Sequence, residues 1–350
     1  MTNFDDLKLA VEALSGGKNT VRLDDLGMPS ILVPFPKLKY ADVMTGGTQD
    51  ALPAFIVDGV EKDVIHVGKY QSIVVNNRAY SLPFKDPANS LNFDNALLYC
   101  RNKGQGWHLN TNALFAAISM WCYKNGTVPQ GNSNYGQSFV NPHEKGVPTH
   151  YNNVSTGQVG RVATGSGPVT WYHNYSDSGI ADLMGNIWEW IAGLRLVSGE
   201  IQIIPNGNAM KLDCNMSATS TEWKAILSDG SLVNPGTAGT LKLDFVSSRW
   251  RISTTITSSS DSLRNAPFSN TDAATGVDIP QLLRGLGLFP VSDFTYGNGS
   301  LYANNTQEER LPYRGGGFSN TSHAGVSALY LSSARSNVSA DFGFRPAFYE

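Results

Sequence analysis

The sequence contains few cysteines, which excludes proteins held together by a network of disulfides or by a cysteine-bound zinc ion. Only three, Cys100, Cys122 and Cys214, occur among 350 residues. Such an odd and scattered set excludes a disulfide framework and the paired spacing of a zinc ribbon. We therefore expect three buried thiols that pack as small apolar side chains.

Charge and long apolar runs are also scarce. Charged residues make up 16% of the chain, and 26 basic against 29 acidic residues give a net charge of −3. Without a basic field we expect no nucleic-acid binding. No apolar run approaches the roughly 20 residues of a membrane helix, so we expect no membrane insertion. The acidic start, residues 1–6, lacks the pattern of a signal peptide, so Sec export is not expected.

The remaining composition favours a packed, loop-rich protein. Hydrophobic residues reach 41%, enough for a sizeable core, and 35 glycines with 17 prolines favour turns over helix bundles. Apolar spacing predicts a short helix over residues 3–14 that stops at Gly16 and Gly17. Short strands are expected over residues 30–35, 54–59 and 64–70, with a hairpin turn at 57–60.

Two longer helices are expected next, and irregular structure follows them. Asn92 and Thr111 are candidate caps of helices whose apolar faces include Cys100 and Cys122. Ordered loops are expected from about 124 to 175. Residues 196–300 mix strands, at 200–204 and 241–245, with Ser/Thr-rich stretches, and this pattern indicates an insertion.

Catalytic motifs are missing. The six histidines show no metal-binding spacing, and neither a nucleophile elbow nor a phosphate-binding loop occurs. The sharpest local pattern is Glu189 between Trp188 and Trp190. A carboxylate beside two indoles needs a partner, which could be a cation, an arginine or backbone donors, and Arg345 is the candidate for a structural ion pair.

Several motifs together resemble a known family. Five sets of residues follow the order seen in the formylglycine-generating-enzyme branch of the C-type lectin fold. They are Asn92 to Cys100, Trp107 to Trp121, Gly131-Asn132, Asp182 to Trp190 and a C-terminal set. The C-terminal set is Arg314-Gly315-Gly316, Ala324-Gly325-Val326, Ala334-Arg335-Ser336 and Gly343-Phe344-Arg345. Within that branch it resembles the variable proteins of diversity-generating retroelements.

The resemblance implies an α+β, loop-rich C-type lectin fold with short strands and two main helices. It divides the chain into a helical segment, residues 1–27, which could serve as a docking element, and a lectin-like domain, residues 28–350. The domain would carry the insertion at about 196–300 and a variable region at about 313–345.

In this family an error-prone reverse transcriptase replaces adenines, mostly in asparagine codons, which never yields Lys, Glu, Gln, Met or Trp. Residues 315–344 contain none of these five. Ser, Gly, Asn and aromatic residues, which also dominate antibody paratopes, are frequent there. The candidate diversified, ligand-binding residues are Gly317, Phe318, Ser319, Asn320, Thr321, His323, Ser327, Tyr330, Ser332, Ser333, Asn337, Val338, Ser339, Ala340, Asp341 and Phe342.

Alternation in the strand-like stretch predicts which of these side chains point outward. Ala328, Leu329 and Leu331 are expected to face inward, and Ser327, Tyr330 and Ser332 outward. On this interpretation Leu329→Ala weakens the fold, whereas Tyr330→Ala alters only binding.

The resemblance implies a non-enzymatic protein that recognises a cell-surface protein or glycan. A phage or prophage virion part, such as a tail tip, is the expected location, with host cytoplasm or cell surface as alternatives. The rival function is a formylglycine-generating oxidase, but that branch holds copper with paired cysteines near the C-terminus, and none follows Cys214. No cofactor is required; calcium, which some members bind, could use Asn186 and Glu189 as oxygen ligands.

Overall fold

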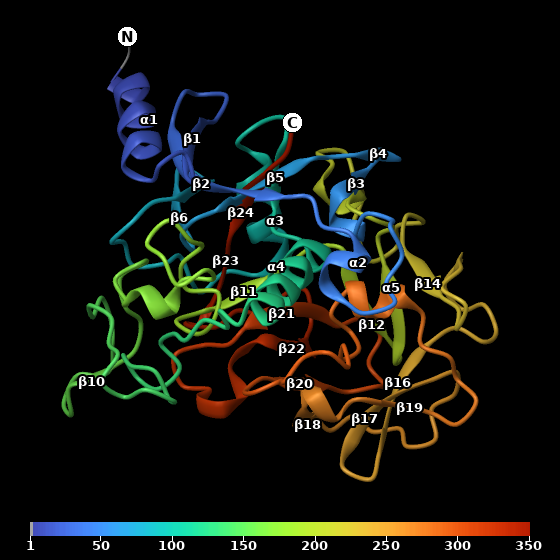
Figure 1. Cartoon of the computed structure of the whole chain (residues 1–350). Coiled ribbons are helices and arrows are strands. Elements are labelled where there is room, and N and C mark those ends of the chain that lie inside the picture. Colours follow the sequence, from blue (N-terminus) through green and yellow to red (C-terminus); the bar gives the residue numbers. More distant parts are fainter. Residues whose placement is uncertain (1–2) are drawn as a thin grey trace.

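The first sheet joins the two ends of the chain. The computed structural model describes residues 3–350. Figure 1 shows this sheet near both termini, and its strands run in the order β1-β2-β5-β24-β8. Their bounds are β1 Thr20–Leu23, β2 Pro29–Pro36, β5 Val64–Gly68, β24 Pro346–Phe348 and β8 Trp107–Leu109. Because β24 pairs with both β5 and β8, the last residues complete a sheet begun near the first.

Two main helices follow the sequence expectation. α3 (Phe93–Arg101) begins where Asn92 Oδ1 accepts the Asn95 N–H, and α4 (Asn112–Asn125) begins where Thr111 Oγ1 accepts the Leu114 N–H. Both predicted caps are thus confirmed. α1 (Asn3–Leu14) is also confirmed, and the remaining α-helices are the short α2 (Tyr40–Val43) and α5 (Gln281–Gly285). No helix within residues 3–350 has both the length and the apolar character needed to cross a bilayer.

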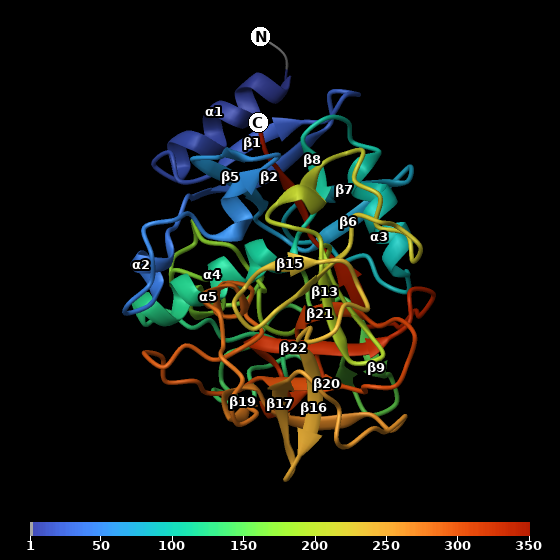
Figure 2. The same ribbon diagram turned by 90° about the vertical axis from the view of Figure 1, so that its right-hand side faces the viewer.

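A second sheet contains the C-terminal segment. Its strand order is β18-β20-β22-β21-β11-β23, and β22 runs across the molecule between β20 and β21 (Figure 2). The bounds are β18 Arg264–Pro267, β20 Ser300–Ala303, β22 Gly325–Ser333, β21 Leu311–Gly315, β11 Trp188–Trp190 and β23 Phe342–Phe344. β11 therefore places the Trp-Glu-Trp motif directly between two strands of the C-terminal segment.

A third sheet is built from the expected insertion. It contains β12 Leu194–Val197, β13 Glu200–Ile203, β14 Lys224–Ile226, β15 Leu232–Val233, β16 Lys242–Val246, β17 Arg249–Ser253 and β19 Asp272–Ala273. Leu243, Trp250 and Ile252 from this sheet share one core cluster with Phe115 of α4 and Leu329 of β22. The insertion therefore packs against the rest of the molecule and has no separate core.

Three short hairpins complete the strands, and the first was expected. They are β3 Ile56–Val57 with β4 Val60–Glu61, β6 Ser72–Val75 with β7 Arg78–Ser81, and β9 Tyr151–Asn153 with β10 Gln158–Val159. The predicted turn between β3 and β4 is confirmed, because Asp58 and Gly59 adopt φ of 54° and 75°, as such tight hairpins require. Between 124 and 175 the chain is otherwise mostly loop.

The structure corrects two expected boundaries. Of the predicted segment 1–27, residues 1–2 lie outside the described residues, and residues 3–27 do not form a separate segment, because β1 pairs with β2 over four residues and belongs to the first sheet. Residues 196–300 are not a single inserted unit, because β18 and β20 from its end extend the sheet of the C-terminal segment. Sequence pattern alone does not reveal which sheet a strand joins. The α+β class, the short strands and the two main helices are confirmed.

Candidate ligand-binding face

The predicted variable positions lie in three stretches around one sheet. We call residues 313–345 the tail. Within it, residues 317–323 form the turn after β21, residues 325–333 form β22, and residues 337–341 form the loop that leads into β23. In Figure 1, β20 and β22 lie at the end of the molecule opposite α1 and both termini.

Aromatic rings from five adjacent strands join these stretches. We call Trp188, Tyr302, Tyr313, Tyr330 and Phe342 the aromatic floor. Ring centroids are 4.1 Å apart for Trp188 and Tyr330, 4.7 Å for Tyr302 and Tyr330, and 4.6 Å for Tyr313 and Phe342. Each ring comes from a different strand: Tyr302 from β20, Tyr330 from β22, Tyr313 from β21, Trp188 from β11 and Phe342 from β23. Aromatic pairs at such distances stabilise the sheet beyond the area they bury.

Small polar groups border the floor beside Trp188. Asn320 Oδ1 accepts the Gly317 N–H at 2.7 Å, and the Ser339 hydroxyl donates to Asp341. A Cβ on Gly317 would lie 2.9 Å from Asp341 Oδ2 and 3.2 Å from Trp188 Cδ1. The first and third stretches therefore meet at Gly317, where a larger side chain would displace Asp341.

Several predicted outward residues are buried instead. Ser327, Tyr330 and Ser333 are buried, and Gly317 and Phe318 are covered as well. The predicted alternation is therefore wrong for Ser327 and Tyr330. Ala328 also packs with Tyr330 in the aromatic cluster, whereas Leu329 and Leu331 enter the other core. The physical reason is that β22 is an inner strand with packed layers on both faces, which alternation alone does not distinguish from a half-exposed strand.

The other candidates remain accessible. Five of them are exposed, namely Ser319, His323, Asn337, Val338 and Ala340. Six are half-buried, namely Asn320, Thr321, Ser332, Ser339, Asp341 and Phe342. Val338 has 58% of its surface exposed, so its side chain is accessible for contacts. The accessible candidates form the two loops and the outer edge of the floor.

The backbone of the first loop is held from outside the tail. The Tyr135 N–H donates to the Phe318 carbonyl at 2.7 Å, and the Thr321 N–H donates to the Ser133 carbonyl at 2.8 Å. The Tyr135 and Phe318 rings also pack at 6.0 Å. Because these hydrogen bonds use main-chain atoms, they do not depend on which side chains the loop carries.

The second loop is held in the same way. Arg161 Nη1 donates to the Ala340 carbonyl at 2.9 Å, and its guanidinium also pairs with Asp86 at 3.0 Å. The Ser90 N–H donates to the Ser339 carbonyl, and the Trp188 N–H donates to the Asp341 carbonyl. Scaffold groups thus fix this loop through its carbonyls, while the side chains of Val338 and Ala340 stay exposed.

The arginines of the tail anchors are structural. Arg314 is buried and donates to Asn112 Oδ1 and the Gly287 carbonyl, and burial lowers its pKa to about 9. Arg335 pairs with Asp94 at 2.7 Å and Glu309 at 3.1 Å. These ion pairs and hydrogen bonds tie the ends of the variable stretches to helices and loops elsewhere in the chain.

The predicted pair of Glu189 and Arg345 is confirmed. Arg345 Nη2 lies 2.6 Å from Glu189 Oε1, and both residues are fully buried. Asn186 is also engaged, since its Oδ1 accepts the Val162 N–H and its Nδ2 donates to Gln71. The guanidinium stands where a cation on Glu189 would have to sit, so the geometry offers no support for calcium there. The calcium assignment stays a prediction for metal analysis.

The thiols are buried, as the sequence predicted. Cys100, Cys122 and Cys214 are all free and buried. Burial raises the pKa of each thiol, for Cys214 to about 12, so no reactive thiolate is present at neutral pH. Within residues 3–350, no three His, Cys, Asp or Glu side chains are grouped as metal ligands.

The fixed members of the aromatic floor were not predictable from the sequence. Tyr302 lies just beyond the expected insertion, and it reaches the tail because β20 pairs in parallel with β22. Trp188 was noted only as a neighbour of Glu189, and Tyr313 immediately precedes an anchor. Their pattern of one ring per strand emerges only once the strand order is known.

Comparisons with known proteins found matches among solved structures alone. No protein-family model and no curated protein matches the chain. Treponema denticola variable protein 1 is 11% identical, has a TM-score of 0.35, and is matched over 95% of this chain and 99% of that chain. The P3c and I1 variants of the Major Tropism Determinant are both 13% identical, with TM-scores of 0.33 and 0.32, over 95% of this chain and 71% of theirs.

By name these neighbours are a variable protein and variants of a tropism determinant, the kind of protein that the tail motifs resemble. Such low identities and TM-scores do not by themselves establish a function. What this chain can bind therefore has to be argued from the geometry of its own tail.

Proposed function

We propose that this chain is a non-enzymatic binding protein with a C-type lectin fold whose tail surface is diversified by a retroelement. One observation carries the proposal: both tail loops are fixed through main-chain atoms by groups outside the tail, while side chains such as Val338 and Ala340 project outward. Substitution of exposed side chains on a fixed backbone usually changes stability by less than about 0.5 kcal/mol. Such a surface can therefore vary while the fold persists.

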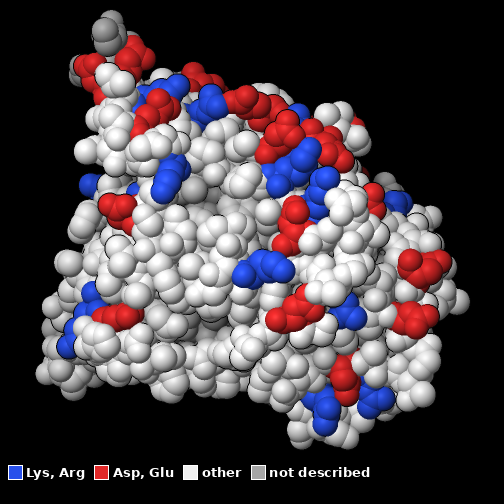
Figure 3. Space-filling view, viewed as in Figure 1, with Lys and Arg blue, Asp and Glu red and all other residues white. Residues whose placement is uncertain are grey.

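The ligand of this face is a receptor on a host cell, either a surface protein or a glycan. The chain itself belongs to a phage or prophage virion and lies in the phage tail. Two features favour this arrangement. The tail loops lie in the half of the molecule away from α1 and both termini, so α1 could dock while the loops face a cell (Figure 1). Apart from Asp341 and His323, the accessible candidates of the tail carry uncharged side chains, whereas charged side chains gather near α1 (Figure 3). Contacts on this face would thus be mainly aromatic and neutral polar.

The first test compares the genes of sibling genomes. We expect differences concentrated at exposed positions such as Ser319, Val338 and Ala340, and identity at Leu329 and the arginine anchors. An imperfect copy of the tail, with asparagine codons at the variable positions and a reverse-transcriptase frame nearby, should accompany the gene. Differences spread evenly over buried and exposed tail positions would contradict the proposal.

The second test is binding to intact host cells by the full chain, read by flow cytometry. Val338→Asp should weaken binding about tenfold or more, because it places a charge in an apolar contact. Val60→Asp is the matched control, since Val60 is 57% exposed against 58% for Val338 but lies on β4, outside the tail. Equal binding by both variants, with unchanged melting temperatures, would place the binding surface elsewhere.

A further inference from the structure

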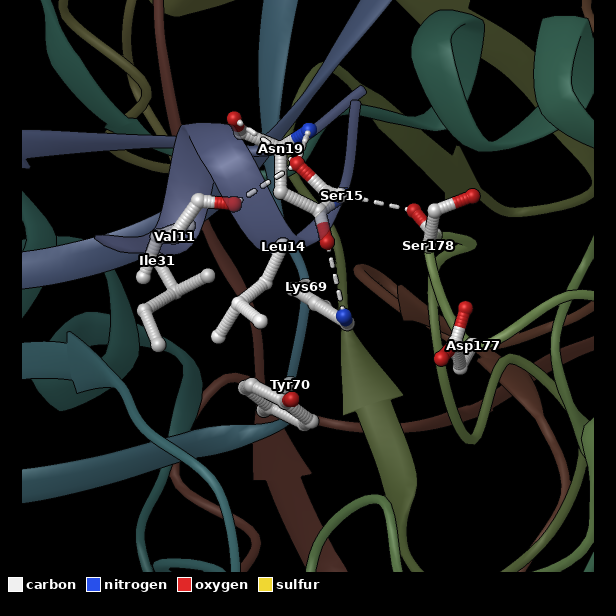
Figure 4. A pocket seen from close by; sticks show the side chains of 9 residues that line it. All are labelled: Val11, Leu14, Ser15, Asn19, Ile31, Lys69, Tyr70, Asp177 and Ser178. Atoms are coloured by element: carbon white, nitrogen blue, oxygen red, sulfur yellow. Dashed lines mark hydrogen bonds between the residues drawn. The ribbon is translucent and has the colours of Figure 1, made fainter. Parts of the chain in front are cut away.

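A small cavity lies between helix α1 and the first sheet, outside the tail (Figure 4). Val11 and Leu14 of α1 line one side, Ile31 of β2 lies beside them, and Lys69 and Tyr70 follow β5. Its volume of about 160 Å³ would hold about five water molecules at their share of liquid volume. A ligand of this cavity must therefore be small.

The cavity contains a buried ammonium group in a fixed position. Lys69 is only 8% exposed, and its backbone is held by hydrogen bonds to Ile31 and Ala181. Its Nζ donates to Asn19 Oδ1 at 2.7 Å. The Asn19 amide in turn donates to the Ser178 carbonyl, which turns its oxygen toward Lys69.

This ammonium is only partly compensated by a negative charge, that of Asp177 at the rim of the cavity. Within residues 3–350, Lys69 forms no ion pair at 4.0 Å or less, and one hydrogen bond uses only one of its three donors. The rings of Tyr70 and Tyr172, at 5.6 and 6.0 Å, offer weak cation–π contacts at the limit of their range. Burial lowers the pKa of Lys69 although the charge of Asp177 raises it, so the compensation by Asp177 is incomplete. An anion bound in the cavity would supply what the protein does not.

The other walls restrict the kind of anion. Val11, Leu14 and Ile31 form an apolar side opposite Lys69 (Figure 4). Asp177 is exposed at the rim, where its negative charge disfavours a dianion and favours an ammonium group. We infer that this cavity binds a small aliphatic monocarboxylate, with its carboxylate on Lys69 and its alkyl group against α1, and that an α-amino acid binds best.

The test is isothermal titration calorimetry of the full chain with three probes: butyrate, 2-aminobutyrate and inorganic phosphate. We expect millimolar binding of both carboxylates, tighter for 2-aminobutyrate, and weaker or no binding of phosphate. Lys69→Met should weaken carboxylate binding about tenfold to a hundredfold through loss of a charge-assisted hydrogen bond. Lys62→Met is the matched control, because Lys62 lies against Tyr349 and outside the cavity.

A second variant guards against loss of the fold. Leu14 is 90% exposed, so Leu14→Trp should leave the fold intact while its ring obstructs the cavity. It should abolish carboxylate binding. The inference is overturned if wild type binds neither carboxylate, if phosphate binds as tightly, or if either the Lys69→Met or the Leu14→Trp protein binds as wild type does.

Discussion

Tyr330 shows how burial changes the meaning of a tail residue. Its side chain is 8% exposed and lies between Trp188 and Tyr302, with Tyr313 at 5.7 Å. No hydrogen bond of its hydroxyl is found within residues 3–350. Tyr330 therefore contributes through its ring, as part of the platform beneath the accessible loops.

We expect Tyr330→Ala to lower the free energy of unfolding by about 3–5 kcal/mol, because truncating a buried aromatic leaves a cavity. Leu329→Ala should cost a similar amount, about 2–5 kcal/mol. Urea unfolding at neutral pH measures both. Tyr330→Phe, which keeps the ring, is the control and should stay within about 1 kcal/mol of wild type. If the urea midpoint of Tyr330→Ala equals that of wild type, the Tyr330 side chain points outward, as the alternation predicted.

At the scale of an element, the loop over residues 337–341 is a candidate contact surface that depends on a distant residue. Arg161 lies far from it in sequence, yet its guanidinium binds both the Ala340 carbonyl and Asp86. The loop has few other attachments to the scaffold, chiefly the backbone hydrogen bonds from Ser90 and Trp188. Its order should therefore be sensitive to loss of this one side chain.

Arg161→Ala should loosen this loop without unfolding the protein. The expected loss of stability is about 1–3 kcal/mol, the cost of removing hydrogen bonds from a charged group. Hydrogen–deuterium exchange should rise in peptides covering residues 334–344 and stay unchanged in α4. Arg249→Ala is the control, since Arg249 pairs with Asp272 on the exposed surface, where such pairs contribute little. Unchanged exchange in the tail peptides would show that the loop does not need Arg161.

At the scale of the whole molecule, buried histidines set the response to acid. Burial lowers the pKa of His66, His108 and His173 from 6.5 to about 4. His173 also accepts the Ile180 N–H on Nδ1, which a protonated ring could not do. Between pH 6.5 and 4 the unfolded chain therefore binds protons that the folded chain does not, and stability falls as the pH decreases.

Asp182 opposes this trend. Burial raises its pKa from 3.8 to about 6, so its folded form gains protons first and stability rises as the pH falls from 6 to 4. Three histidines outweigh one carboxyl, so we expect a net loss of melting temperature between pH 7 and 4.5. Asp182→Asn should lose the opposing contribution and show a steeper fall. A flat profile for wild type would contradict the burial of these groups.

Local features of the fold were predictable from sequence because they depend on neighbouring residues. The caps at Asn92 and Thr111, the turn at Asp58 and Gly59, and the helix that ends before Gly16 each follow from contacts within a few positions. The ion pair of Glu189 and Arg345 was predictable for another reason: a carboxylate between two indoles needs a buried partner. Strand partners were not predictable, since β20 and β22 alternate in ways compatible with several sheets.

The sequence by itself determined that the protein is packed and loop-rich and where its main helices and their caps lie, because composition and short-range spacing specify these directly. The ends of the tail were placed by the resemblance to a family. Tertiary structure alone decided which tail residues are accessible. β22 is covered on both sides by layers from distant parts of the chain, so Tyr330 and Ser327 are buried, whereas Val338 is not. Burial depends on what packs against a residue, and here the packing partners come from β11, β20 and the third sheet.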